Sequence, residues 1–387
     1  MSGVAELPLH DGHVPRWLLG YMERLSDALL RVLHEIYGPD KTIEFFSDPL
    51  WFQAFNNIIG MDWDSSGSTT VVTAVIKKIS WSRDLDFLVL GGKGIHSRKT
   101  IDEIPVAVKR LGLGEDQISY LATISRIAAK IDSAMLQDGY SLYHHALLIS
   151  RNGFWVVIQQ GMNTTAKMAR RYHINKSTLD LRDLVNPHSG VASNQILRPL
   201  NLVDESSRET IRVIEDLLKE RSSKILSDIR VANARLKGLK SLLAYSSSHR
   251  EESFEKRSFS IPFYKPIEIS RELIDAINEA QLRGAETIAE ALGIRGFSAE
   301  VVRALALVAD LIYNAPPSNR DPVTHPIDPF KYSYAHGGKD GIPYRVRRDL
   351  LERTIVTLEE AVERARVGDR ERLDMLKRLS RYSKLLL

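Results

Sequence analysis

Two short runs of apolar, β-prone residues stand near the middle of the chain, at 146–150 and 154–158. Asn152 and Gly153 lie between these runs, and both residue types accept the positive φ angles that a tight hairpin turn requires. Runs of this length joined by Asn-Gly predict an antiparallel β-hairpin.

Pairs of polar residues flank the predicted hairpin. His144 and His145 precede the first run, and Gln159 and Gln160 follow the second. The start of one strand lies beside the end of its antiparallel neighbour, so the pattern predicts that the imidazoles and amides are neighbours. Adjacent residues of a strand point to opposite faces, so His144 and His145 cannot both face one cavity.

Helical periodicity dominates the rest of the chain, apart from a short buried strand expected at 87–90. The predicted helices span 16–37, 49–59, 164–172, 205–244, 349–367 and 369–385, and a helix pair joined by a glycine turn spans 288–312. The fold class is therefore predicted as α+β. It is mostly helical, with a small antiparallel sheet in the N-terminal domain and a helical C-terminal domain that carries a helix–hairpin–helix-like motif.

A polar, serine-rich and charged segment at 246–260 has the composition of a flexible linker. It suggests three parts. Residues 1–204 form an α+β domain with the candidate active site, residues 205–260 form a helical arm and linker, and residues 261–387 form a helical domain that binds nucleic acid.

Composition narrows the class of protein. The 387 residues are 43% hydrophobic and 26% charged, which is typical of globular chains. No apolar run is long enough to span a membrane, and the N-terminus lacks a signal-peptide pattern, so we expect a cytoplasmic protein without a membrane partner. The absence of cysteine excludes disulfides, thiolate nucleophiles and cysteine-ligated zinc. A net charge of +4 favours a polyanionic partner.

Side chains capable of chemistry gather around the hairpin. Carboxylates can hold a hard divalent cation, and an imidazole can act as a base. The candidate catalytic residues are Lys130, Asp132, Asp138, His144, His145 and Gln159. Asp132 and Asp138, together with Asp62, are the candidate ligands of Mg²⁺ or Mn²⁺. The alternative is a polar core network, since no metal-binding spacing is present.

Two glycine- or serine-rich segments resemble phosphate-binding loops. Residues 91–94 follow the expected strand and lead into a basic stretch, and Thr100 with Glu103 predicts a capping box at the next helix. The spacing is not that of a nucleotide-binding Walker loop. Residues 65–70 also precede a helix, where Ser68 or Thr69 can cap free amides that otherwise bind an anion.

The turn at 293–297 resembles the helix–hairpin–helix element, which aims backbone amides at a DNA phosphate. Ser298 replaces the second glycine of that motif and Glu300 replaces a basic residue, so a plain αα-hairpin is the alternative. Residues 332–344 interleave aromatic residues with glycine, histidine and lysine, which suits base stacking. The candidate nucleic-acid-binding residues are Lys93, Arg98, Lys99, Arg170, Arg171, Gly296, His336, Lys339, Arg345 and Arg347.

Several strings together resemble an uncharacterised domain-of-unknown-function family (number seven-six-three) of archaea and thermophilic bacteria. They lie at residues 7–10, 48–55, 91–94, 136–145, 159–163, 169–173 and 334–341. The resemblance spans nearly the whole chain and implies no established activity. Other members of this family look more like a regular helix–hairpin–helix at the Gly296 turn, which favours DNA as the binding partner.

Three hypotheses follow. The first is a DNA repair or processing protein with a metal-dependent nuclease centre, in which Lys130 stabilises developing charge. The second is a nucleic-acid-binding protein without catalysis. The third is a glycosylase-like base-excision enzyme, with Asp321, Asp328, Lys339 or Asp340 as the catalytic residue. Homo-oligomerisation is left open.

Overall fold

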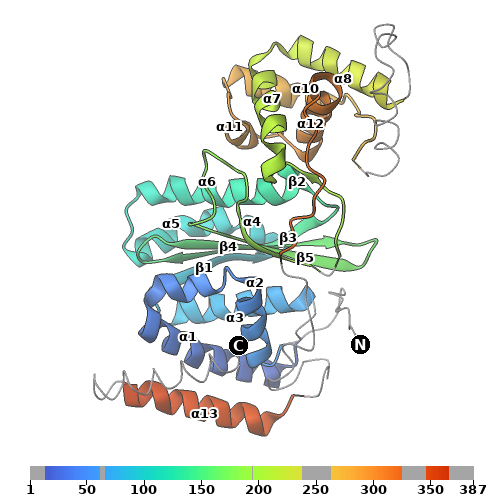
Figure 1. The fold of residues 1–387 in the computed structure, drawn as a ribbon. Helices are drawn as coiled ribbons and strands as arrows, with labels where there is room; N and C mark the ends of the chain where they lie inside the picture. Colours follow the sequence, from blue (N-terminus) through green and yellow to red (C-terminus); the bar gives the residue numbers. More distant parts are fainter. Residues whose placement is uncertain (1–13, 62–65, 194, 238–262, 325–345, 366–387) are drawn as a thin grey trace.

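An antiparallel sheet of five strands lies at the centre of the protein (Figure 1). The computed structural model describes residues 14–61, 66–193, 195–237, 263–324 and 346–365. The strands run in the order β1-β3-β4-β5-β6 across the sheet. Their bounds are β1 (Phe87–Lys93), β3 (Ser141–Ser150), β4 (Trp155–Asn163), β5 (Met168–Asn175) and β6 (His188–Ala192). The predicted α+β class with a small antiparallel sheet is confirmed.

Both faces of this sheet are covered, which explains why its strands are continuous apolar runs rather than alternating ones. On β3, Leu147 and Ile149 join one hydrophobic cluster, while Ala146 and Leu148 join another on the opposite face. A strand buried on both sides gains from apolar residues at every position. The predicted hairpin between β3 and β4 is confirmed: Gly153 has φ of 75° in its turn, and Ile149 pairs with Trp155.

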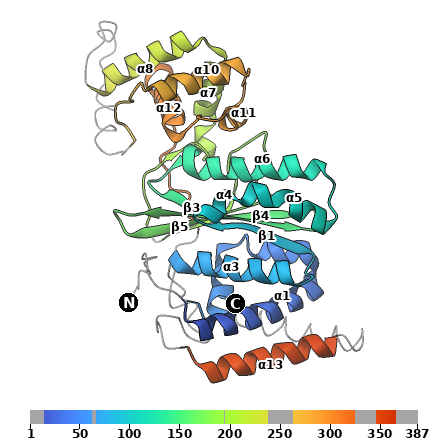
Figure 2. The same cartoon turned by 180° about the vertical axis from the view of Figure 1, so that it is seen from behind.

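One face of the sheet is covered by α1 (Arg16–Phe45), α2 (Pro49–Ile58) and α3 (Ser66–Ser82). The helix α13 (Arg348–Ala365) lies across α1 on the outside of this layer (Figure 2). Leu351, Ile355 and Leu358 pack in the same cluster, and Arg24 pairs with Glu352 at 3.2 Å. The apolar stripe of α13 is therefore buried against α1.

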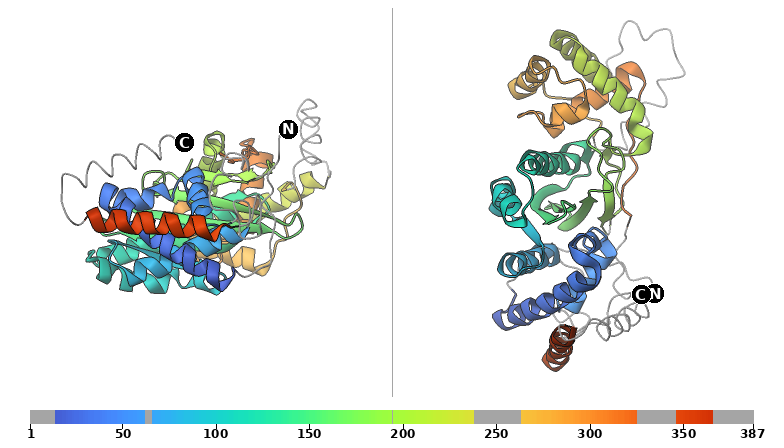
Figure 3. Two further views of the ribbon diagram at one scale, coloured as in Figure 1. Left: turned by 90° about the horizontal axis from the view of Figure 1, so that it is seen from below. Right: turned by 90° about the vertical axis from the view of Figure 1, so that its left-hand side faces the viewer.

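The other face is covered by α4 (Ile95–Arg98), α5 (Thr100–Leu111) and α6 (Asp116–Lys130), as the side view in Figure 3 shows. The last turn of α6 widens into the π-helix η1 (Ile131–Met135), which leads to the short strand β2 (Leu136–Gln137). β2 pairs with β7 (Leu200–Asn201) in a second, two-stranded sheet.

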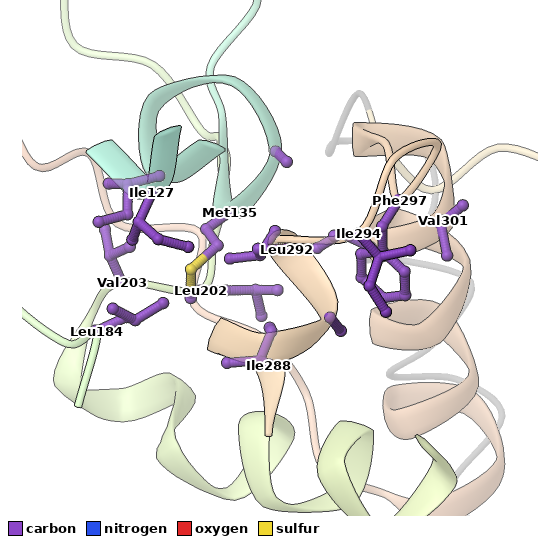
Figure 4. Packing of buried hydrophobic residues seen from close by; sticks show 14 of the residues in the cluster. Ile127, Met135, Leu184, Leu202, Val203, Ile288, Leu292, Ile294, Phe297 and Val301 are labelled. Carbon is purple, nitrogen blue, oxygen red and sulfur yellow. The ribbon is translucent and has the colours of Figure 1, made fainter. Parts of the chain in front are cut away.

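A bundle of helices packs beyond α6. It contains η2 (Glu205–Ser207), α7 (Arg208–Lys219), α8 (Ser222–Leu236), α10 (Arg271–Leu282), α11 (Ile288–Leu292) and α12 (Ala299–Tyr313). Figure 4 shows its contact with η1, where Met135 lies near Leu292. One continuous hydrophobic cluster runs from the sheet through α6 into this bundle. The segment expected as a connecting arm is therefore part of the bundle, since α7 and α8 pack against α12.

Two predicted helices were wrong in type or extent. Residues 164–172 form a turn and most of β5, because their polar residues alternate between two buried faces instead of lining one side of a helix. Residues 205–244 do not form one helix: Glu220 and Arg221 are extended, with ψ of 158° and 139°, and separate α7 from α8.

Within the described residues, no helix is long and apolar enough to cross a membrane. Asp62, His336, Lys339 and Arg345, which the sequence suggested as ligands or nucleic-acid contacts, lie outside the described residues.

Gly91 is the position at which the sheet leaves least room for a side chain. Its φ is 81°, and a Cβ there would lie 2.3 Å from both the carbonyl oxygen of His145 and Oγ1 of Thr100. We expect Gly91→Ala to lower the free energy of unfolding by about 2 kcal/mol or more, from the left-handed φ and the backbone clash. Urea denaturation measures this loss.

Gly20 is the matched control, since it lies within α1 with nothing within 4 Å of its Cβ position. Gly20→Ala should be neutral or stabilising by up to about 1 kcal/mol, because alanine favours the helix. Equal effects of the two substitutions would contradict the close approach at Gly91.

Candidate functional site

Two rows of polar side chains cross the sheet at the same level, one on each face. Residues directly opposite each other in an antiparallel sheet share a face, so the register defines each row. The α3-side row, on the face covered by α1 to α3, consists of Lys93, His144, Gln160 and Arg171. The α6-side row, on the other face, consists of His145, Gln159 and Tyr172.

The predicted pairing of imidazoles and amides is confirmed. His144 lies opposite Gln160 and His145 lies opposite Gln159, so each face receives one imidazole and one amide. All four side chains are buried. The polar groups at this end of the hairpin are thus divided between two separate interiors, not collected in one.

On the α6 side, hydrogen bonds link five side chains in a chain. Gln159 donates to the carbonyl oxygen of Ala128 at 3.0 Å and to Oδ2 of Asp132, which fixes the orientation of its amide. Its Oε1 then accepts from Nδ1 of His145, 2.9 Å away. Nε2 of His145 must therefore be unprotonated and accept from the hydroxyl of Ser125 at 2.8 Å. Burial lowers the pKa of His145, in agreement with a neutral ring.

Asp132 lies in the π-helix η1 and links this chain to its fifth member, His188. Its Oδ1 is 2.6 Å from Nε2 of His188 on β6, and its Oδ2 is held by Gln159. The carboxylate of Asp132 is fully buried where the π-helix η1 meets β6. Both oxygens of Asp132 therefore have donors from the protein.

Asp138 belongs to a different network. Its Oδ2 accepts from Arg170 at 3.0 Å and from the hydroxyl of Tyr172 at 2.7 Å. Arg170 also forms two hydrogen bonds with Asp321, at 3.1 and 2.9 Å. Burial by itself lowers the pKa of Arg170, but the two carboxylates outweigh it and raise that pKa. Arg170 is thus an ion-paired core residue that does not reach the surface.

The described residues show no metal site at Asp132 and Asp138. Asp132 and Asp138 are satisfied in separate networks, and no group of three potential ligands is close enough to hold a metal ion within the described ranges. Lys130, expected to stabilise charge beside them, instead donates to the carbonyl oxygen of Phe297 at 2.6 Å. It thereby ties the end of α6 to the glycine turn of the bundle.

On the α3 side, Nε2 of His144 lies 3.2 Å from Oγ1 of Thr73. Burial lowers the pKa of His144 to about 3, and the neighbouring His145 and Lys93 add to this effect. Arg171 is also buried. It lies over the ring of Phe52, with 4.4 Å from the guanidinium carbon to the ring centroid.

The glycine loop of residues 91–99 leaves the sheet edge beside this row. Gly91, Gly92 and Gly94 all have positive φ, so the loop follows a path that only glycine adopts without strain. Lys93, Arg98 and Lys99, which follow or interrupt these glycines, are exposed. None of the three forms an ion pair with another described residue.

The capping box expected at α5 is absent, which corrects the sequence interpretation. Glu103 accepts from the amide of Gly91 at 2.8 Å and pairs with Lys77 at 2.7 Å, so its side chain holds the glycine loop. Thr100 donates to the carbonyl oxygen of Ser97 instead of capping the helix. The same carboxylate thus fixes the backbone from which the loop's cations project.

The turn between α11 and α12 is exposed at Arg295, Gly296 and Ser298, and Gly296 has φ of 92°. Glu300 is paired with Arg303. Near this turn, a cleft of about 770 Å³ opens between α6, α7 and α11 and the loop at 181–185. Its basic lining residues are Arg126, Arg182, Arg208 and Arg212.

Sequence patterns missed four residues of these networks: Ser125, Thr73, His188 and Asp321 as a partner of Arg170. Ser125 and Thr73 lie inside helices without a motif. His188 was visible within the Asn-Pro-His-Ser-Gly string, but its contact with Asp132 joins residues 56 positions apart. The bidentate pairing of Arg170 with Asp321 spans 151 positions, which no local pattern encodes. Arg347, a suggested nucleic-acid contact, is exposed and paired with Asp349.

The fold and these buried rows describe an α+β protein with a polar interior on each face of one sheet. The chain belongs to the family described as protein of unknown function (DUF763), whose model matches residues 3–346. No curated protein and no solved structure matches the chain significantly.

Arg170→Met should be strongly destabilising, because it leaves the buried carboxylates of Asp138 and Asp321 without their cation. The expected loss is about 3–5 kcal/mol in the free energy of unfolding. Arg182→Met is the control: its pair with Asp180 is on the surface, and such pairs contribute little to stability. Chemical denaturation of both variants measures the difference, and a cost at Arg170 as small as at Arg182 would contradict the network.

The buried neutral His144 should make stability depend on pH. Its pKa of about 3 in the folded state lies below the ordinary value of about 6.5, so the unfolded chain binds the proton more readily. Stability should be full above about pH 6.5 and fall by about 1.4 kcal/mol per unit as the pH drops below it. Unfolding measured between pH 7 and 5 should show a shallower slope for His144→Gln. His96→Gln, on the exposed helix α4, should leave the slope of the parent protein, and identical slopes in all three proteins would refute the assignment.

Proposed function

We propose that this protein binds DNA through its sugar–phosphate backbone, and that the glycine loop of residues 91–99 makes the contact. The observation that carries the proposal is the clustering of Lys93, Arg98 and Lys99 on this loop, exposed and without ion pairs among the described residues. Cations that are not neutralised within the protein attract phosphates and release the counterions that surround them. The net charge of +4 favours the same class of partner.

The rigid backbone of the loop supports this proposal. Glu103 and Lys77 hold Gly91, and the amide of Gly94 donates to the carbonyl oxygen of Tyr143 at 2.7 Å. Ser97 donates to the carbonyl oxygen of Gly94 at 2.6 Å. A loop already fixed in place loses little conformational entropy when it binds, so more of the electrostatic attraction appears as affinity.

This proposal corresponds to binding without catalysis by the buried carboxylates. Asp132 and Asp138 already receive hydrogen bonds from Gln159, His188, Arg170 and Tyr172, so a shared cation would compete with these contacts. The nuclease hypothesis would require these networks to open. The polar groups of the α6-side row are instead assigned to fixing the sheet.

The test is fluorescence anisotropy with single- and double-stranded DNA over a range of salt concentrations. The triple variant Lys93→Ala, Arg98→Ala, Lys99→Ala should bind about tenfold or more weakly, and its logarithmic salt slope should fall by about one unit per lost phosphate contact.

The matched control is Lys109→Ala, Arg230→Ala, Lys265→Ala, which removes the same charge from exposed sites elsewhere. Equal losses of DNA affinity in the two triple variants would show that the effect depends on net charge alone. The glycine loop would then be rejected as the binding site. The same samples with Mg²⁺ or Mn²⁺, analysed on gels, would reveal strand cleavage. If the protein cleaves the strands and Asp132→Ala abolishes this cleavage, the nuclease hypothesis would replace this proposal.

A further inference from the structure

Adjacent residues Arg170 and Arg171 are both buried, but among the described residues only Arg170 is paired with carboxylates. Arg170 faces the α6 side and pairs with two carboxylates. Arg171 faces the α3 side, and no carboxylate of the described residues lies within ion-pair distance of it. Burial accordingly lowers the pKa of Arg171 to about 9. A guanidinium removed from water without a counter-charge is costly, so this arrangement calls for an anion.

The hydrogen bonds of Arg171 leave its terminal nitrogens weakly held. Its Nε donates to Nε2 of His173 at 2.9 Å. Among the described residues, the two terminal nitrogens contact only neutral oxygens, those of Thr69, Pro49 and Gln53, each at 3.4 Å. These distances are at the long end of the hydrogen-bonding range. The fork of donors that best matches an oxyanion is therefore the part of Arg171 with the poorest partners.

The helix α3 begins beside this fork. Thr69 directly follows the first turn, whose amide groups have no acceptor within the helix and where the helix dipole is positive. Ser68, next to Thr69, is fully buried, and its hydroxyl has no hydrogen-bond partner among the described residues. Nδ1 of His144, in the same row as Arg171, is likewise buried and without a partner in that part of the chain. Buried polar atoms normally have partners, so two such atoms near one uncompensated cation point to a ligand.

The row also connects this buried end with the surface. Lys93 stands at its outer end, opposite His144 in the register, and is exposed on the glycine loop. The positive charge of Lys93 contributes to the lowered pKa of His144. The α3-side row thus carries two cations, Lys93 outside and Arg171 inside.

We propose that the α3-side row binds a phosphate group, held by Arg171 and the hydroxyls of Thr69 and Ser68 at the start of α3. Building on the proposed DNA binding, we assign this group as the terminal phosphate of a strand. An internal phosphodiester has chain on both sides and needs an open groove, whereas a terminal phosphate can enter a buried row from one end.

The first experiment measures thermal unfolding of the full chain in inorganic phosphate and in chloride at equal ionic strength. Phosphate should raise the melting temperature progressively, because a ligand that binds only the folded state stabilises it. Arg171→Met should abolish the rise while melting no lower than the parent protein in chloride, since it removes an uncompensated buried charge. Thr69→Val is a second, milder variant that should weaken the response. Arg230→Met, an exposed arginine on α8, should respond as the parent protein does.

The second experiment compares oligonucleotides of one sequence with a 5′-phosphate, a 3′-phosphate or no terminal phosphate, by calorimetry. One phosphorylated end should bind at least about tenfold more tightly than the unphosphorylated strand, and Arg171→Met should remove that advantage. The loss of the advantage in Arg171→Met, with residual binding through the glycine loop, separates this site from the loop.

Two results would overturn the inference. If phosphate gives no stabilisation and Arg171→Met is strongly destabilised in chloride, the chain itself supplies the counter-charge. If phosphate stabilises but no phosphorylated end binds more tightly, the strand-end assignment falls. If the protein still binds DNA after either result, the proposed function stands. If the protein does not bind DNA but phosphate still stabilises it, only the proposed function is rejected.

Discussion

The hydrogen-bond register of β3, β4 and β5 determines where the polar residues of the interior lie. Because both faces of the sheet are covered by helices, a shift of one residue would exchange the two rows and place every apolar side chain against the wrong layer. The register therefore has to satisfy two hydrophobic clusters and two polar rows at once. This double requirement explains how histidine, glutamine and arginine can be buried at one end of strands that are otherwise apolar.

The two faces of the sheet differ in how their buried polar groups are paired. On the α6 side, hydrogen-bond donors and acceptors match. The carboxylates of Asp132, Asp138 and Asp321 are paired with Gln159, His188, Tyr172 and Arg170. Such a satisfied network fixes the core and resists opening. On the α3 side, a cation and two polar atoms lack that match within the described residues. Structural rigidity and ligand binding are thus assigned to opposite faces of one sheet.

The glycine loop links these interiors to the surface. Its backbone is fixed by Glu103 through Gly91, and its cations project from the edge strand that begins the α3-side row. The helical bundle is joined to the same framework by Lys130, which bonds the glycine turn before α12. Contacts between distant segments therefore position both the glycine loop and the glycine turn, two of the regions that the sequence suggested for nucleic acid.

The sequence by itself determined the features that depend on near neighbours. The Asn-Gly turn and the flanking apolar runs fixed the β3–β4 hairpin, and the period of two placed His144 and His145 on opposite faces next to their glutamines. Tertiary structure decided the rest. The buried arginines of β5 resemble a polar helix in sequence, because the two layers that cover them come from residues far away. Likewise, whether Asp132 and Asp138 share a cation or lie in separate networks depends on partners as distant as Asp321, and no local pattern contains that information.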